Sequence, residues 1–549
     1  MEKVSGWGPI VTAGIFSSTL SSALASFVGA PKTFQAVCRD KLFPKVEFFA
    51  VGHGPANEPR RAYVLAFIIA VAFIAIGELN AIAPIISNFF LICYALINYS
   101  VFAASLGNSP GWRPSFKFYN MWVSLVGALL CVVIMFLIKW WSALIAIIIC
   151  VGLYKFVDYR KPEVNWGSSG QANTYMTALR LTNMLDNQAE HVKNFRPQFL
   201  VLTGHPSKHL ALMTIVSQMS KNVGLMMYGN VYVGNGDVPE EDAIEEKKWL
   251  REHKIKAFRA ATTAQNLRAG AQAMFNLSGL GKLRPNTVVL GYMENWRSES
   301  KDLASYFGII NDAFDFSYGL CILRMGDREL DIEDGISSDS ETEAENQNQK
   351  KDVEKGVKQP LKAAPEPLSS EITFKEKQQG TIDVWWLYDD GGLTVLLPYL
   401  LTQHRLWGGC KLRLFSLDIR SKHTIKATEL KMANLMKKFR ITVSSVEQVS
   451  GANTNPSKKS LDAFKMLAGE EELEGGEVTD QKVLRTIRVG ELVRERSKDA
   501  NLVVISLPIP VAEVTTPNLY MSMLEALSAD LPPVLLIRGN QSSVLTFYS

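Results

Sequence analysis

Long apolar segments are confined to the first 160 residues of this 549-residue chain. Residues 61–77 and 121–138 carry no charge after Arg61, and residues 81–105 form an apolar run interrupted by prolines, serines and asparagines. A helix needs about 20 apolar residues to cross roughly 30 Å of hydrocarbon. We therefore predict a transmembrane region over residues 1–160 with about five spans, at 8–30, 61–77, 81–105, 119–138 and 140–156.

The pattern changes after residue 160, where short runs of branched and aromatic residues alternate with helical periodicity. Strands are predicted at 198–204, 222–233, 287–292 and 318–324, and again at 381–387, 411–415, 440–444, 502–506 and 533–537. Helices are predicted at 207–220, 240–253, 264–277, 303–314, 425–438, 481–497 and 517–528. Such alternation favours an open, mostly parallel sheet with helices on both faces. We interpret residues 161–325 and 379–549 as two Rossmann-like α/β subdomains that are diverged repeats.

The segment 326–378 between the two subdomains has no apolar periodicity. Nine acidic residues and only one basic residue occur between positions 327 and 345. Such a segment buries too little apolar surface to offset its ordering entropy, so we predict a disordered acidic linker. Ser338 and Ser340 lie among its carboxylates, which is compatible with phosphorylation and equally with a solvated spacer.

Charge is distributed unevenly between the two regions. Residues 1–160 hold 12 basic and 6 acidic residues, whereas the remainder carries a slight acidic excess. The basic residues gather in the loops 31–60 and 106–118, which are predicted to be cytoplasmic together with the tail. No basic face interleaved with aromatic residues indicates nucleic-acid binding. This orientation places Met1 outside the membrane, so we expect the C-terminal part of a longer polytopic protein, whether as a fragment, a partial gene model or a short splice form.

Motifs for catalysis or resident cofactors are absent from the sequence. The six cysteines are widely spaced, and His205 and His209 have no third metal ligand nearby, so a surface turn is the favoured interpretation. No glycine-rich stretch follows a strand and opens a helix with phosphate-loop spacing. The run Asp389-Asp390-Gly391-Gly392 fits a metal site or a charged turn. We expect no enzyme, no cofactor and no metal site other than one for a transported cation.

The segment 8–30 is unusually rich in small hydroxyl residues. Close helix packing is one explanation, because small residues let helices approach in lipid and hydroxyls bond back to helix carbonyls. Coordination of a hard cation by adjacent hydroxyls at mid-membrane is the other. Ser21 and Ser22 lie near the middle of this span, where a cation site requires them.

Tyr94 is the second candidate. It lies deep in the segment 81–105, and a phenol in hydrocarbon needs a partner for its hydroxyl. A neighbouring helix or a permeating anion would meet that need.

Several strings resemble the cation-chloride cotransporter family, and most closely its sodium-coupled branch of sodium–potassium–chloride cotransporters. They are residues 21–26 (SSALAS), 30–32 (APK), 82–90 (IAPIISNFF), 94–98 (YALIN), 109–114 (SPGWRP), 161–169 (KPEVNWGSS) and the closing RGN and VLTFYS within 538–549. The resemblance covers nearly the whole chain and weakens in the acidic linker and around 450–480.

The resemblance implies a partial LeuT-like, amino-acid-permease fold, with the eighth to twelfth helices of a twelve-helix bundle, followed by the cytoplasmic domain. It implies a sodium site formed by the hydroxyls of Ser21 and Ser22 and the carbonyl of Ser18, and a chloride site at Tyr94.

The function implied is electroneutral symport of sodium, potassium and chloride across the plasma membrane, serving cell volume and chloride homeostasis. Implied partners are these ions, a second copy bound through the cytoplasmic domain, and kinases acting on an N-terminal region outside this chain. A sodium–chloride cotransporter and a non-transporting short form that dimerises with a full-length protein are the alternatives. Half a bundle cannot enclose ions from both sides, so we expect this chain alone not to transport.

Overall fold

The computed structural model describes most of the chain and divides it into two compact units, Met1–Leu181 and Thr182–Ser549. The described residues are 7–43, 45–108, 110–116, 118–160, 169–234, 236–298, 300–325, 374–417, 425–469, 478, 480–511 and 514–545.

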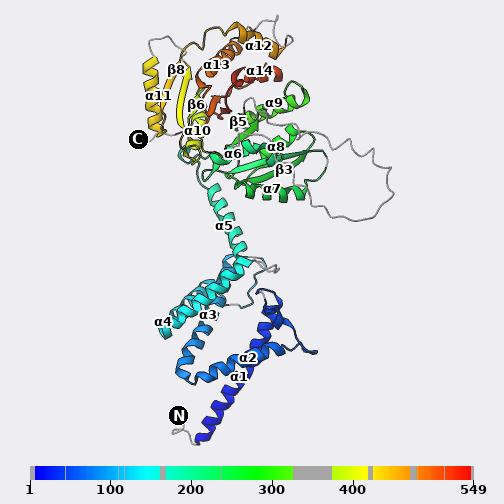
Figure 1. The fold of residues 1–549 in the computed structure, drawn as a ribbon, viewed down its shortest axis with the longest axis vertical. Coiled ribbons are helices and arrows are strands. Elements are labelled where there is room, and N and C mark those ends of the chain that lie inside the picture. The colour runs from blue at the N-terminus through cyan, green and yellow to red at the C-terminus, as the bar shows by residue number, and fades with distance from the viewer. Residues whose placement is uncertain are drawn as a thin grey trace, which may run out of the picture. The chain divides into compact units, whose positions relative to one another are not determined.

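The first unit is entirely helical in its described part (Figure 1). Its elements are α1 (Gly8–Arg39), the 3-10 turn η1 (Val46–Ala50), α2 (Arg60–Ile76), α3 (Leu79–Leu106), α4 (Met121–Arg160) and the start of α5 (Ser169–Asp186). Three stretches are long and apolar enough to span a membrane, namely Gly8–Arg39, Ile82–Leu106 and Met121–Tyr159. Helix α1 packs on α2 and η1, and α3 packs along α4. Apolar side chains cover the outer surface of these helices, as a membrane protein requires.

Helix α4 is broken at Lys139, whose backbone is extended (φ −163°, ψ 102°). The break separates two apolar helical pieces, as the separate predicted spans 119–138 and 140–156 require. Asn88 of α3 is fully buried beside the break and donates to the Lys139 carbonyl at 3.4 Å and to the Ser142 hydroxyl. A carbonyl freed at a helix break in an apolar region needs such a partner. Asn88 therefore stabilises the bend and ties α3 to α4.

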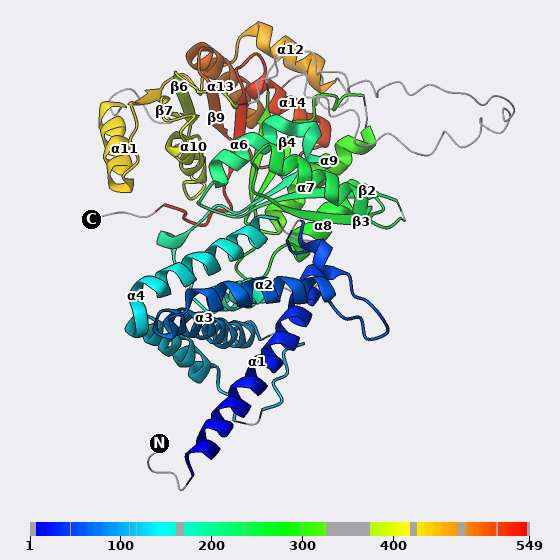
Figure 2. The ribbon, with the colours of Figure 1, turned by 60° about the horizontal axis from the view of Figure 1, so that its bottom comes forward.

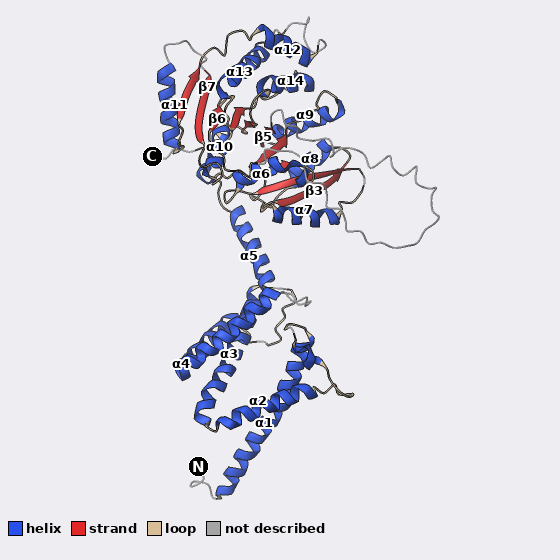
Figure 3. Ribbon diagram, viewed as in Figure 1, coloured by secondary structure: helices blue, strands red, loops and turns tan. Residues whose placement is uncertain are grey.

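The second unit contains one ten-stranded sheet with helices on both faces (Figure 3). Its strands are β1 (Phe199–Leu202), β2 (Met226–Val233), β3 (Phe258–Ala264), β4 (Thr287–Gly291), β5 (Gly319–Arg324), β6 (Thr381–Trp385), β7 (Lys411–Leu417), β8 (Ser445–Val449), β9 (Leu502–Ser506) and β10 (Val534–Arg538). Its helices are the 3-10 turns η2 (Val192–Asn194) and η3 (Pro206–His209), and α6 (Leu210–Ser220), α7 (Glu240–Glu252), α8 (Leu267–Leu277), α9 (Ser300–Asp315), α10 (Leu393–Gln403), α11 (Ile425–Phe439), α12 (Lys458–Ala468), α13 (Gln481–Ser497) and α14 (Pro517–Ser528).

The strand order, β3-β2-β1-β4-β5-β10-β9-β6-β7-β8, contains the same five-strand topology twice. All neighbours are parallel except β5 and β10, which pair antiparallel at the centre. In that pair Ile322 lies opposite Leu536, and Leu320 and Arg324 lie opposite Arg538 and Val534. This register places a pseudo-twofold axis at the central pair. The prediction of a mostly parallel sheet in two Rossmann-like halves is confirmed, and the halves share one continuous sheet.

Two hydrophobic cores, one on each face of the sheet, run through both halves. Alternate residues of each strand enter opposite cores, as Leu320 and Cys321 of β5 do. Helices α8, α9, α13 and α14 contribute to one core, and α6, α10 and α11 to the other. On the second face α6 and α10 lie side by side, although they belong to different halves (Figure 2).

Several predicted element positions are wrong. The predicted helix 264–277 begins too early, because Phe258–Ala264 forms strand β3, whose small and hydroxyl residues gave a weak strand signal. The strand predicted at 440–444 lies at Ser445–Val449, because Arg440 has a left-handed backbone (φ 57°) that ends α11. Helices α5, α10 and α12 were not predicted.

Most of the predicted linker, residues 326–373 with Ser338 and Ser340, lies outside the described residues. Its predicted end at 378 is too late. Phe374 is 2% exposed, and its carbonyl accepts a 2.7 Å hydrogen bond from Gln218 of α6. Trp407, whose ring lies 5.7 Å from that of Phe374, donates to the same Gln218. Residues 374–378 therefore belong to the folded second half.

Candidate functional site

Helix α1 carries the three residues of the predicted sodium site. It begins after Trp7 with a proline in its first turn and continues unbroken past mid-span, with Pro31 inside its last third. Ser18 precedes Ser21 by three residues and Ser22 by four, so all three lie on one face of the helix. All three are exposed within this chain.

The two paired serines keep their hydroxyls free, unlike the threonines of the same helix. Thr19 donates to the Ile15 carbonyl at 2.8 Å, and Thr33 donates to the Gly29 carbonyl. Among the described residues, Ser21 and Ser22 make no side-chain hydrogen bond. Free hydroxyls one turn from a backbone carbonyl are oxygen ligands of the kind that a hard cation prefers. This face therefore presents two free hydroxyls of the kind that a cation site would use.

Tyr94 lies on α3 and is 53% exposed. Its ring lies 6.5 Å from that of Phe90, one turn earlier, and its carbonyl accepts from the Asn98 side chain at 2.9 Å. The phenol hydroxyl has no partner among the described residues, so it stays available as a donor to an anion. Helix α1 packs mainly on α2 whereas α3 packs mainly on α4, and no side-chain hydrogen bond or ring contact among the described residues joins Tyr94 to the serines.

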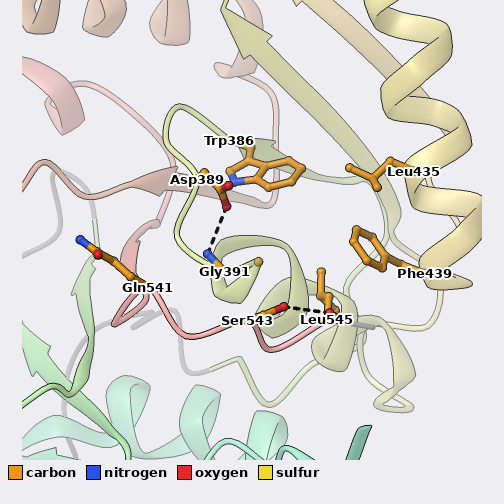
Figure 4. Close-up of a pocket in the computed structure, with 9 residues that line it drawn as sticks. Trp386, Asp389, Gly391, Leu435, Phe439, Gln541, Ser543 and Leu545 are labelled. Atoms are coloured by element: carbon orange, nitrogen blue, oxygen red, sulfur yellow. Dashed lines mark hydrogen bonds between the residues drawn. The ribbon is translucent and has the colours of Figure 1, made fainter. Parts of the chain in front are cut away.

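A cleft of about 440 Å³ lies in the second unit, near the carboxyl end of β6 (Figure 4). It is lined by Trp386, Asp389, Gly391, Gly392, Leu435, Phe439, Gln541, Ser543 and Leu545. Asp389 accepts from the Gly391 amide at 3.3 Å, and the Ser543 hydroxyl donates to the Leu545 carbonyl at 3.0 Å. Among the described residues, its lining contains no basic, histidine or cysteine side chain.

The neighbouring Asp390 has a structural role. It is fully buried, and its carboxylate accepts hydrogen bonds from the amides of Gly392, Thr394 and Gly539 and from the Thr394 hydroxyl. These donors hold the turn into α10 and join it to the end of β10. Gly391 and Gly392 adopt left-handed backbones (φ 75° and 97°), which explains the paired glycines. Of the two interpretations of the Asp-Asp-Gly-Gly run, the turn is the one that these contacts support.

The histidines and cysteines form no site in the described part of the chain. His205 accepts from the Ser207 amide at 3.4 Å and opens η3, while burial and the neighbouring Lys208 lower the pKa of His209. No group of three potential metal ligands occurs among the described residues. The cysteines are all free there, with Cys321 and Cys410 buried in the sheet domain.

A buried charge cluster at the centre of the sheet was not predicted. Arg324, at the end of β5, is 7% exposed and donates to Glu525 of α14 at 2.7 Å and to the Ser528 hydroxyl at 3.0 Å. Tyr292 donates to the same carboxylate at 2.6 Å, and its ring lies 4.5 Å beneath the Arg324 guanidinium. Burial alone would lower the pKa of Arg324, but the neighbouring Tyr292 and Glu525 outweigh it and raise the pKa. The cluster joins the two halves, and no local sequence signal marks residues so distant along the chain.

Comparison with known proteins gives two family matches. The model described as solute carrier family 12 matches residues 209–366 and 338–549, and the amino acid permease model matches residues 1–201. Solute carrier family 12 member 2 of Homo sapiens is 44% identical over 627 aligned residues, which cover 100% of this chain and 51% of that protein. Solute carrier family 12 member 1 of Mus musculus is also 44% identical, with 100% and 56% covered. This chain thus spans about half the length of the curated relatives it matches.

Among solved structures, the cytoplasmic domain of a prokaryotic cation chloride cotransporter aligns with 64% of this chain and 99% of its own chain. The identity is 12% and the TM-score 0.36.

Proposed function

Because the chain belongs to solute carrier family 12, we propose that it is the C-terminal half of a symporter that moves sodium, potassium and chloride together without net charge. The observation that carries this proposal is 44% identity over the full length of the chain to solute carrier family 12 members 1 and 2. The resemblance of its motifs to those of the sodium-coupled cation-chloride cotransporters is the basis for proposing sodium, potassium and chloride as the transported ions. The proposed activity is transport and not catalysis.

Charge-neutral coupling has a physical advantage. Moving one net charge against the membrane potential costs about 2.3 kcal/mol per 100 mV. Cotransport of cations with an equal charge of chloride avoids that cost, so the summed concentration gradients of the transported ions set the direction of transport and the membrane potential does not oppose it. The protein would act in the plasma membrane, with the sheet domain in the cytoplasm and a second copy bound through that domain. Kinase control would act on parts outside this chain.

In this proposal the α1 face with Ser21 and Ser22 supplies hydroxyl ligands for sodium, and the Ser18 carbonyl supplies a third oxygen. The free hydroxyls of the two serines support this assignment. Tyr94 would donate to chloride from α3. The remaining ligands would come from helices that this chain does not contain.

The test is sodium-dependent rubidium uptake by cells that express the complete protein. Replacing Ser21 and Ser22 together by Ala should raise the sodium concentration needed for half-maximal uptake at least tenfold, because two charge-assisted ligands are lost. Thr19→Ala is the matched control, since its hydroxyl already bonds to the Ile15 carbonyl of its own helix. Unchanged sodium dependence in the double variant would remove these hydroxyls from the site. Uptake of sodium and chloride without rubidium would favour the sodium–chloride alternative.

A further inference from the structure

The pseudo-twofold axis at the centre of the sheet relates two buried arginines. Arg324 ends β5 and Arg538 ends β10, and the central register places them at equivalent positions. The same spacing along the chain relates Tyr306 of α9 to Tyr520 of α14. Each of these tyrosines donates its hydroxyl to a carbonyl that follows or ends a neighbouring strand, Gly291 and Pro508 respectively. The two arginines therefore occupy corresponding places in two copies of one arrangement.

Their electrostatic surroundings differ sharply. Arg324 has Glu525 at 2.7 Å and Glu294 at 3.7 Å. Arg538 is only 9% exposed, yet among the described residues its side chain has no ion pair and no hydrogen bond, and its Nε, like that of Arg324, is buried without a partner. The centroid of the Tyr388 ring lies 4.8 Å from its guanidinium carbon.

The missing counter-ion can be traced to particular residues. The position on α9 that corresponds to Glu525 is Asn311, which is neutral. The next residue, Asp312, is bound by both guanidinium nitrogens of Arg268 at 2.7 Å and by Gln272. In the segment that follows β9, the described residues 507–511 (LPIPV) contain no acid, and Glu513 lies outside the described residues. Asp390 approaches the next residue, Gly539, but its oxygens are occupied by three backbone amides and the Thr394 hydroxyl.

We propose that Arg538 is the anchor of an oxyanion site at the carboxyl edge of β10, which takes a phosphate or carboxylate group of a small solute. Stacking on Tyr388 occupies the face of the guanidinium and leaves its in-plane N–H donors free. Those donors form the fork that matches two oxygens of one anion. A cation this deeply buried is unfavourable without a counter-charge, so an entering oxyanion supplies what Glu525 supplies to Arg324.

The test is titration of the purified full chain in detergent with inorganic phosphate, followed by ³¹P line broadening, with acetate and chloride as parallel competitors. Arg538→Gln should weaken phosphate binding about tenfold or more, because charge-assisted hydrogen bonds are lost. The matched control Arg405→Gln removes an exposed cation and should leave binding unchanged. Phosphate displaced by acetate would identify a general oxyanion site, and phosphate retained against acetate would identify a phosphate site; both support the proposal.

A second variant tests the proposal even if Arg538→Gln does not fold, because it keeps Arg538. Asn311→Glu restores the acid that the other half possesses, so it should abolish phosphate binding while preserving Arg538. Equal phosphate affinity in wild type and Arg538→Gln, an equal loss in Arg405→Gln, or displacement of phosphate by chloride at equal concentration would each overturn the proposal.

Discussion

Replacing Glu525 by Gln should loosen the junction between the two halves of the sheet. The carboxylate accepts from Arg324 at 2.7 Å and from Tyr292 at 2.6 Å, and it lies on α14, which packs against α9 across the pseudo-twofold axis. A glutamine keeps the shape of the side chain and can still accept from one donor. It removes the negative charge, so a guanidinium that is 9% exposed loses its main counter-ion.

The magnitude follows from burial. Removing one partner of a buried ion pair costs about 3–5 kcal/mol, because the remaining charge stays desolvated. Here Glu525 keeps 20% side-chain exposure, and Glu294 lies 3.7 Å from the same guanidinium, so some of that cost is recovered. We therefore expect a loss of about 2–4 kcal/mol, which is roughly a 30- to 900-fold change in an opening equilibrium.

Hydrogen exchange of the full chain in detergent measures that equilibrium locally, which avoids a global unfolding transition that two units would complicate. Amides of β5 and β10 should exchange faster by the stated factor. Glu447→Gln is the control, because its pair with Arg496 spans 3.4 Å and both side chains are at least 40% exposed, so its loss costs at most about 1 kcal/mol. If both variants exchange β5 and β10 amides at the same rate, the central cluster does not hold the halves together.

Two further predictions concern the packing of α12, α13 and α14. Gly490→Ala should destabilise the packing of α13 on α14 by about 1–2 kcal/mol, because a Cβ at position 490 would lie 2.2 Å from the Ala526 carbonyl oxygen. The measurement is hydrogen exchange, which should become faster for α13 and α14 amides. Gly236→Ala is the control, since a Cβ there meets open space and should have no effect. Burial raises the pKa of Glu491, but hydrogen bonds from Ser460, Ser457 and Arg488 outweigh it and lower the pKa to about 2. Since this folded-state pKa is below the ordinary 4.5, the stability it contributes is present above pH 4.5 and is lost as pH falls toward 2. Exchange of the first α12 turn should accelerate over that interval, and Glu491→Gln should remove the pH dependence; a variant that retained it would refute the assignment.

The fold could be predicted where the local pattern was strong. Long apolar runs marked the helices of the first unit, and β4, β5, β9 and β10 are nearly continuous runs of Val, Ile and Leu because both faces of the sheet are covered. Strand β3, with the sequence FRAATTA, was missed because it is half-buried along its length and pairs only with β2. Edge strands of this kind are formed by backbone pairing that no local periodicity records.

The site residues show a second limit of sequence reasoning. Ser18, Ser21 and Ser22 could be placed on one helical face from their spacing alone, whereas their free hydroxyls became evident only beside the bonded Thr19. The Arg324–Glu525 pair was beyond reach, since the partners lie in different halves and meet only through the antiparallel β5–β10 pair. Such contacts depend on tertiary pairing, not on any local motif.

The antiparallel central pair also explains why the repeat has not stayed symmetric. Helix α14, which precedes β10, packs on α9 of the other half and supplies the acid for Arg324, and the pseudo-twofold axis relates α9 to α14. One acid suffices to fix the relative position of the halves, and Glu525 also accepts from Tyr292. The equivalent position on α9 is Asn311, which carries no charge. The half that lacks the acid keeps its arginine buried, and a buried cation without a fixed partner remains open to a diffusible one.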